Sequence, residues 1–74
     1  MRLNELNIGD EAVITKIHAK EPLKSKLLSM GFVKGEKVKV LKHTLAKNTF
    51  DIEVANTNVA LREEETREIE VKKI

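Results

Sequence analysis

The chain has no cysteine, tryptophan or tyrosine, and only two phenylalanines among its 74 residues. Without thiols, neither disulfides nor a zinc site built on cysteine can stabilise the fold, which argues against a small secreted scaffold. No apolar run approaches the roughly 18 residues of a membrane span, and the N-terminus lacks the hydrophobic stretch of a signal peptide. We therefore expect a single small domain over residues 1–74 that works inside the cell.

Aromatic side chains that could stack on nucleic-acid bases are also scarce. Phe32 and Phe50 both lie in apolar patterns typical of a core. Residues 1–50 carry ten Lys or Arg against five Asp or Glu, whereas residues 51–74 carry four against seven, within a formal net charge of +2. This imbalance allows weak contact with phosphates, acidic lipid headgroups or an acidic partner. The lack of surface aromatics argues against a specific nucleic-acid binder.

Proline and glycine are few, and each stands where an element should begin or end. Leu23, Leu27 and Met30 recur with helical spacing after Pro22, which suits a first helical position. Gly31 can adopt the left-handed conformation that ends a helix. The pattern predicts one helix of two to three turns, with a positive φ angle at Gly31.

Most other apolar residues alternate with polar ones, as in half-buried strands. The first strand, over 12–17, has Ile14 and Ile17 three residues apart, so both face inward only if a β-bulge intervenes. Further strands are predicted around residues 38–40, 50–54, 59–61 and 69–71, with a turn at Asn56-Thr57-Asn58 and a helical turn over 62–67. This order indicates a mainly β fold, a small closed five-stranded barrel with one short inserted helix. Closure would leave no free sheet edge.

The sequence offers no arrangement typical of catalysis. Ser25 and Ser29 lie on the predicted helix, and neither histidine stands in a context that implies a catalytic triad. Gly31 and Gly35 are not followed by the Lys-Ser/Thr ending of a phosphate-binding loop. We therefore predict no catalytic residue, no cofactor and no enzymatic activity.

His18 and His43 are the only imidazoles and therefore the weak candidates for metal ligands. They are 25 residues apart, each near the end of a predicted strand, without the i, i+3 or i+4 spacing of a fixed metal site. We expect two exposed loop histidines and no metal site. The run Glu63-Glu64-Glu65 is interpreted as a solvated cap of the helical turn, because three consecutive carboxylates cannot all converge on one cation.

Taken together, the apolar and glycine positions resemble the FeoA family of small ferrous iron transport A proteins. The most specific segments are Met30-Gly31-Phe32 with Gly35, and Ala60-Leu61-Arg62. The other matching positions are Leu3, Leu6, Gly9, Ile14, Ile17, Leu23, Leu27, Val38, Val40, Ile69 and Val71. The same domain is similar to the C-terminal domain of iron- and manganese-dependent repressors.

The resemblance implies an SH3-like barrel with an inserted helix in a cytoplasmic bacterial protein. It also implies contact with FeoB, the membrane GTP-binding iron transporter, so that the protein is peripheral to the membrane at most. The sequence departs from the family pattern at Lys34, at the 44–48 loop and at Asn56, where proline or glycine is common. These departures lie in turns and affect partner specificity more than the core.

Leu28 is the apolar helix residue that departs from the core-facing stripe. At 100° per residue it points about 140° away from Leu23 and lies near Lys24. We therefore predict that Leu28, Lys24 and Lys20 form a partner-binding surface with an apolar anchor and a basic rim. Two alternatives remain open, a nucleic-acid-associated small barrel and a metal-responsive regulatory domain.

Overall fold

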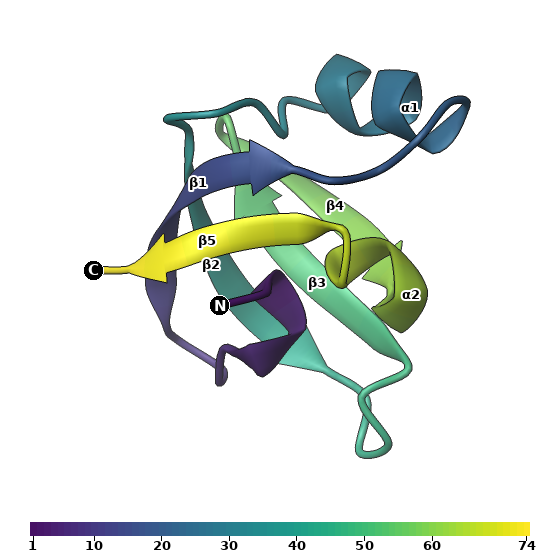
Figure 1. Cartoon of the computed structure of the whole chain (residues 1–74). Coiled ribbons are helices and arrows are strands. Elements are labelled where there is room, and N and C mark those ends of the chain that lie inside the picture. The colour runs from purple at the N-terminus through teal and green to yellow at the C-terminus, as the bar shows by residue number, and fades with distance from the viewer.

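The computed structural model describes all residues from 1 to 74 and consists of one strongly curved antiparallel sheet with three short helices (Figure 1). The sheet order is β4-β3-β2-β1-β5. The strands are β1 (Glu11–Ile17), β2 (Lys37–His43), β3 (Thr49–Val54), β4 (Thr57–Arg62) and β5 (Ile69–Lys73). The helices are the 3₁₀ turn η1 (Leu3–Glu5), α1 (Leu23–Ser29) and α2 (Glu63–Thr66). The predicted mainly β fold with one inserted helix, α1, is confirmed.

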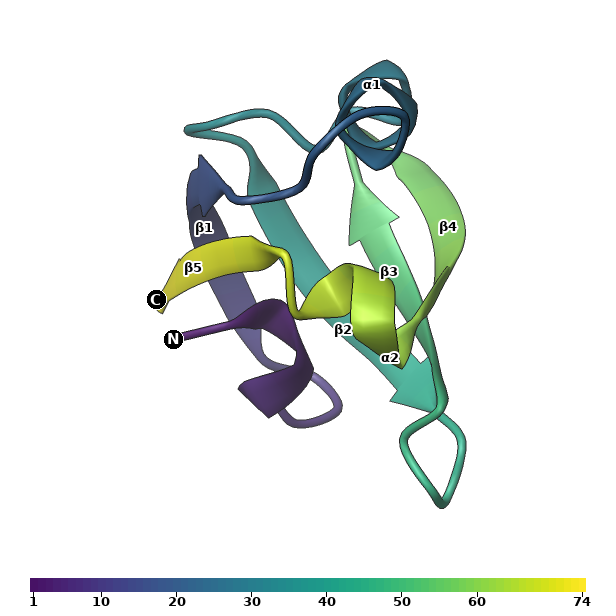
Figure 2. The ribbon, with the colours of Figure 1, turned by 45° about the vertical axis from the view of Figure 1, so that its right-hand side comes forward.

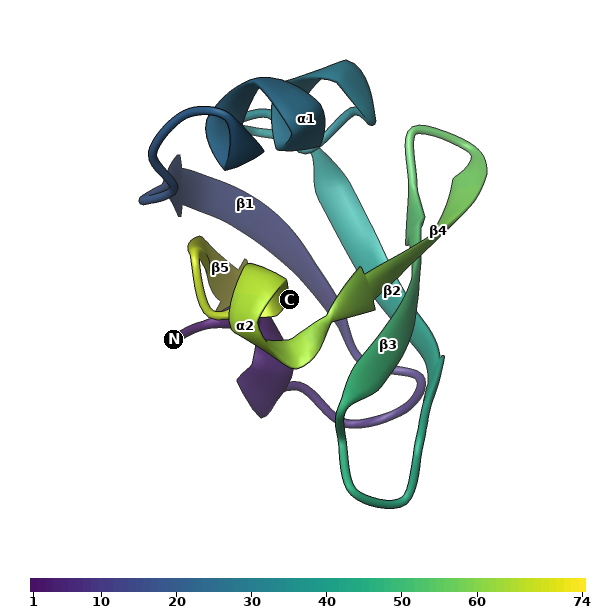
Figure 3. The ribbon, with the colours of Figure 1, turned by 90° about the vertical axis from the view of Figure 1, so that its right-hand side faces the viewer.

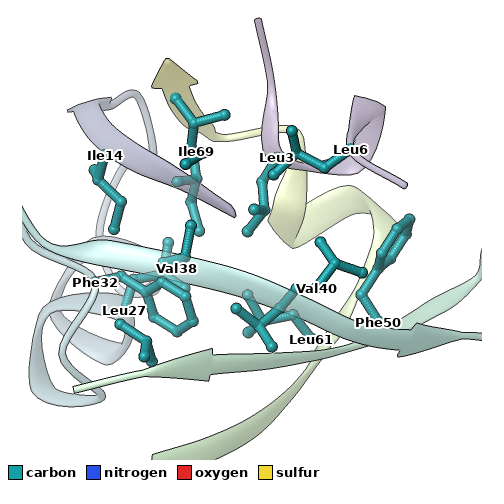
Figure 4. Packing of buried hydrophobic residues seen from close by; sticks show 14 of the residues in the cluster. Leu3, Leu6, Ile14, Leu27, Phe32, Val38, Val40, Phe50, Leu61 and Ile69 are labelled. Carbon is teal, nitrogen blue, oxygen red and sulfur yellow. The ribbon is translucent and has the colours of Figure 1, made fainter. Parts of the chain in front are cut away.

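The core lies inside the curved sheet and draws residues from every strand, from η1 and from α1 (Figure 4). Phe32 and Phe50 are both fully buried within it, as predicted. In β3 the alternation is complete, since Phe50, Ile52 and Val54 are buried between residues that are exposed or half-buried. Burying one such side chain stabilises the fold by roughly 1.5–3 kcal/mol. The strand therefore turns its apolar face toward the core and its polar face outward.

The prediction that barrel closure removes the sheet edges is wrong. β4 and β5 are the two ends of the strand order and do not pair with each other. The chain passes between them through α2 instead of a tight hairpin (Figures 1 and 2). The N-terminus takes the place beside β5, where the Val71 N–H donates to the Met1 carbonyl at 2.8 Å and Arg2 bridges Glu70. One edge is therefore covered by the N-terminal segment, and the other, β4, stays open.

The predicted bulge in β1 is confirmed, because its register against β5 shifts between Ile14 and Lys16. The predicted hairpin turn is displaced by one residue. Ala55 and Asn56 form a two-residue turn with φ values of 50° and 61°, and Thr57 already pairs with Val54. A two-residue loop with two positive φ angles matches the twist of the flanking strands, which explains why pairing starts at Thr57.

Gly31 ends α1 with φ of +100°, as predicted. The Phe32 N–H donates to the Leu27 carbonyl at 3.0 Å, and the Gly31 N–H donates to the Leu28 carbonyl at 3.1 Å. These bonds form a Schellman motif, whose usual hydrophobic contact is supplied by the buried side chains of Leu27 and Phe32. Pro22 was predicted to be the first helical residue, but it is the N-cap, and the helix begins one position later at Leu23. The motif fixes which face of α1 is turned outward.

Candidate partner-docking surface

Helix α1 lies at one end of the barrel, in the connection between β1 and β2 (Figures 1 and 3). Its inner face buries Leu27 completely, and Leu23 is half-buried against the core. Leu28 is turned outward and is 42% exposed. The structure therefore separates the two neighbouring leucines as the helical period predicts.

Lys24 lies about one helical turn before Leu28 on α1, and Lys20 lies in the segment just before the helix. The Lys24 N–H donates to the Lys20 carbonyl at 3.0 Å across the cis Glu21-Pro22 bond, so Lys20 stays next to the start of α1 although it is not part of the helix. Both lysines are exposed, and neither forms an ion pair within the chain. We call Lys20, Lys24 and Leu28 the α1 surface. Its positive charge is available to a partner.

Two charged side chains beside the α1 surface, Glu21 and Lys26, form hydrogen bonds with other residues of the chain. Glu21 Oε1 accepts the Ser25 N–H at 2.9 Å, and hydrogen bonds from Ser25 with the nearby Lys24 charge hold the pKa of Glu21 below its usual value. Lys26 donates to Glu65 of α2 at 3.0 Å and joins the two helices. Glu21 and Lys26 therefore help to hold α1 in place.

Five further large apolar side chains are exposed and were not predicted as site residues: Met1, Ile8, Val33, Leu45 and Ile74. Val33, just after α1, is 39% exposed at the same end of the molecule. Leu45 is fully exposed in the β2–β3 loop, which lies at the opposite end of the barrel from α1 (Figure 1). Neither position has a periodic signal, because both lie in connections whose direction depends on the strands that they join.

The β2–β3 loop that carries Leu45 is ordered by Thr44. The Thr44 hydroxyl oxygen accepts the Asn48 N–H at 2.9 Å, and the Thr44 carbonyl accepts the Lys47 N–H, also at 2.9 Å. Leu45 is thus an exposed leucine on a defined loop, remote from α1. This makes it a matched reference for Leu28.

The structure does not bring the two histidines together. His18 directly follows β1, and His43 is the last residue of β2. Because these two strands are antiparallel, the histidines lie at opposite ends of the sheet. The expectation of two exposed loop histidines is wrong, because both are half-buried and His43 belongs to β2. The His43 ring packs against Phe50 with centroids 5.5 Å apart. No group of three or more His, Asp or Glu side chains has the geometry of a metal site.

His18 has a specific partner that sequence spacing could not reveal. Its Nε2 lies 2.7 Å from Glu70 Oε1 across the β1–β5 ladder, and its side chain is only 28% exposed. The hydrogen bond from His18 lowers the pKa of the Glu70 carboxyl against the opposing effect of burial, and the nearby charges of Arg2 and the N-terminus add to the lowering. The pair joins β5 to the segment that leads into α1.

A polar hollow of about 250 Å³ lies between the start of β2 and the β3–β4 turn. Its rim holds Glu11 and Lys37, which form an ion pair at 2.7 Å. Their mutual hydrogen bond lowers the pKa of Glu11 and raises that of Lys37. The ion pair joins β1 to β2 at the rim of the hollow, and these two charges satisfy each other.

No helix of the structure has the length and apolar character needed to cross a membrane.

Sequence comparison places the chain among known proteins. Residues 1–73 match the family model described as the FeoA domain. A putative Fe(2+) transport protein A from Campylobacter jejuni is 39% identical over 71 residues, which is 96% of each chain. An Fe(2+) transport protein A/Fe(2+) transporter FeoB fusion protein from Porphyromonas gingivalis is 35% identical over all 74 residues, and the match covers 9% of that protein.

Solved structures with the same fold include FeoA proteins. FeoA from Chlorobium tepidum superposes with a TM-score of 0.92 at 28% identity, covering 100% of this chain and 70% of that one. FeoA from Stenotrophomonas maltophilia, complexed with zinc and described as a prokaryotic SH3 domain protein, gives 0.86 at 30% identity over 97% of this chain and 89% of that one. A manganese-dependent transcriptional repressor gives 0.91 at 17% identity over 36% of its length, which shows a shared fold alone. The predicted SH3-like fold is confirmed.

Proposed function

The chain belongs to the FeoA family, and from this premise we propose that it is a non-enzymatic accessory protein of bacterial ferrous iron transport. It acts by direct contact with a FeoB-type membrane transporter, as a single FeoA-like domain on the cytoplasmic side of the membrane. The observation that carries the proposal is the Porphyromonas gingivalis relative, in which a segment like this chain is fused to the transporter. Such a fusion gives the two partners a high effective concentration for each other, and that is useful only if they interact.

Within this proposal, the α1 surface is the part of the molecule that docks on the transporter. Leu28 supplies an apolar anchor that is held in a fixed orientation by the Schellman motif. Lys20 and Lys24 supply a basic rim, and neither of them forms an ion pair within the chain. The barrel itself does not need this outward leucine, because the core contact of α1 is made by Leu27.

The partner surface that fits this arrangement is a shallow apolar patch with carboxylates at its edge. Burying the exposed part of Leu28 contributes roughly 1 kcal/mol, which is a modest share of a specific complex. The lysines act mainly on the rate and orientation of encounter, since charges at the rim of an interface are solvated. We therefore expect binding that weakens as salt concentration rises.

The test is the Leu28→Glu variant, assayed for binding to the cytoplasmic domain of the transporter and for Fe²⁺ uptake in cells. We expect weaker binding and lower uptake with a nearly unchanged thermal midpoint, because the side chain is 42% exposed and lies outside the core cluster. Leu45→Glu is the matched control, since it places the same charge on an exposed leucine at the opposite end of the barrel. This control should bind as the wild type does.

Lys24→Glu tests the electrostatic part of the same surface, with Lys72→Glu as its control. Both lysines are exposed and unpaired, but Lys72 lies on β5, away from α1. Equal binding by the Leu28, Lys24 and control variants would place the interface on another surface. Unfolding of Leu28→Glu would show that Leu28 belongs to the core.

The nucleic-acid alternative is tested with a single-stranded oligonucleotide. Purely electrostatic attraction falls steeply with salt, so we expect no binding at about 200 mM salt. Micromolar binding that persists at that concentration would favour the alternative over the transport function.

A further inference from the structure

Strand β4 presents an open and regular sheet edge. It is the last strand in the order and pairs only with β3 (Figure 2). The β3–β4 register runs without a shift from Val54↔Thr57 to Thr49↔Arg62. An edge of this kind is a template for another strand unless a protein blocks it.

The length of the β3–β4 turn decides which backbone groups of β4 are free. After a two-residue turn, Thr57 faces Val54 as a hydrogen-bonded pair, so Thr57, Val59 and Leu61 bond to β3. The N–H and C=O groups of Asn58 and Ala60 therefore point away from β3. No hydrogen bond outside the β3–β4 ladder involves either residue. The next outward N–H, that of Arg62, is bound by the Glu65 carboxylate at 2.8 Å.

The two edges of the sheet differ in how they are protected. β5 is covered by the N-terminal segment, pairs with β1 through a bulge and ends in Lys72-Lys73. β4 has no proline, glycine, lysine or bulge, and Thr57, Asn58 and Ala60 are exposed. Natural proteins usually protect edges with such features. The bare part of β4 is thus an unprotected edge of limited length.

We propose that this edge binds β4 of a second copy of the chain, forming a two-fold symmetric dimer with a continuous sheet. In antiparallel pairing centred on Val59, Asn58 of one copy faces Ala60 of the other, and the reverse. Each pair exchanges two backbone hydrogen bonds, so the four bonds of the dimer satisfy every free group of these residues in both copies. A register centred on Ala60 would instead require the Arg62 N–H, which Glu65 already holds.

The side chains are compatible with the same register. Val59 lies on the inner face of β4, half-buried against the core, and would meet its symmetry mate directly. Residues 57–61 carry no charge, so no like charges face each other across the axis. The strand residues 57–61 that form this pairing include none of the α1 surface, so the dimer and the proposed docking on the transporter are tested with different substitutions.

The test uses sedimentation of the whole chain from micromolar to millimolar concentration. Wild type should shift from monomer to dimer. Val59→Lys and Val59→Glu alone should each dimerise about fivefold more weakly or worse, because like charges would face each other on the axis. An equimolar mixture of the two variants should recover dimers, since opposite charges then meet. A thermal melt of each variant establishes that it is folded.

Amide hydrogen exchange of the wild-type chain gives a readout without substitution. The Asn58 and Ala60 amides should exchange more slowly as protein concentration rises, whereas the Leu45 amide, which is also in no hydrogen bond, should not. A chain that stays monomeric at millimolar concentration would overturn the proposal. So would variants that dimerise like wild type, a mixture without recovery, or protection of these amides only by an extended peptide of another protein.

Discussion

Replacing Gly31 with alanine should destabilise the protein more than a left-handed glycine position alone explains. Gly31 has φ of +100°, and a β-carbon there would lie 3.1 Å from the Ala55 β-carbon at the β3–β4 turn. The backbone penalty is about 1–2 kcal/mol. Crowding against Ala55 adds roughly 1–3 kcal/mol, because the helix end and the turn must move apart.

Gly9 is the control that isolates the second contribution. Its φ is +90°, but a β-carbon there would have nothing within 4 Å. Gly9→Ala should therefore lose only the backbone contribution. For a domain of this size each 1 kcal/mol shifts the thermal midpoint by roughly 4–8 °C, so Gly31→Ala should melt at least about 4 °C below Gly9→Ala.

The double variant Gly31→Ala/Ala55→Gly tests the cause of the difference. Removing the Ala55 β-carbon eliminates the close contact, and glycine is well suited to the φ of 50° at that position. We expect the extra destabilisation to disappear in chemical or thermal unfolding. If Gly31→Ala and Gly9→Ala melt together, or if Ala55→Gly gives no relief, the packing of the α1 end against the turn is not what limits this position.

Three further results are expected. Burial raises the pKa of Glu65, but hydrogen bonds from the Arg62 N–H and from Lys26 outweigh it, so the pKa in the folded protein lies below 4.5. The stability that this shift contributes is therefore present above pH 4.5 and is lost as the pH falls through the folded pKa. Lys26→Met should raise the pKa of Glu65 in an NMR titration and move the acid-induced loss of stability to higher pH. Leu27→Ala, in a fully buried position, should cost about 2–5 kcal/mol in urea unfolding. Leu45→Ser should change the unfolding free energy by no more than about 0.5 kcal/mol, and a larger loss would show that the loop is packed.

Local patterns predicted most of the elements. The helical spacing of Leu23, Leu27 and Met30 indicated α1, and Gly31 ended it as expected. The three-residue spacing of Ile14 and Ile17 indicated a bulge that the β1–β5 register contains. These predictions are correct because each feature depends only on residues a few positions apart. Over that distance the rotation per residue and the allowed φ angles determine the local conformation.

The candidate site was only partly accessible from the sequence. The angle between Leu28 and Leu23 placed Leu28 outward, and it is exposed. The sequence could not show that Lys26 is held by Glu65 while Lys24 is unpaired, because that ion pair joins residues 39 positions apart. The same reason hid the His18–Glu70 pair, which spans 52 positions.

The sequence alone determined the family resemblance, the apolar faces and the positions where the chain turns, since these follow from side-chain type and spacing. Only the tertiary structure decided how the sheet ends. Hydrophobic alternation determines which face of a strand points to the core but not which strands it pairs with. The pattern is therefore equally compatible with β4 and β5 being paired or unpaired. The N-terminal segment covers β5, and the two-residue turn at Ala55-Asn56 directs the Asn58 and Ala60 backbone groups outward. The open edge of β4 therefore arises from strand order and turn length, which depend on the packing of the whole chain.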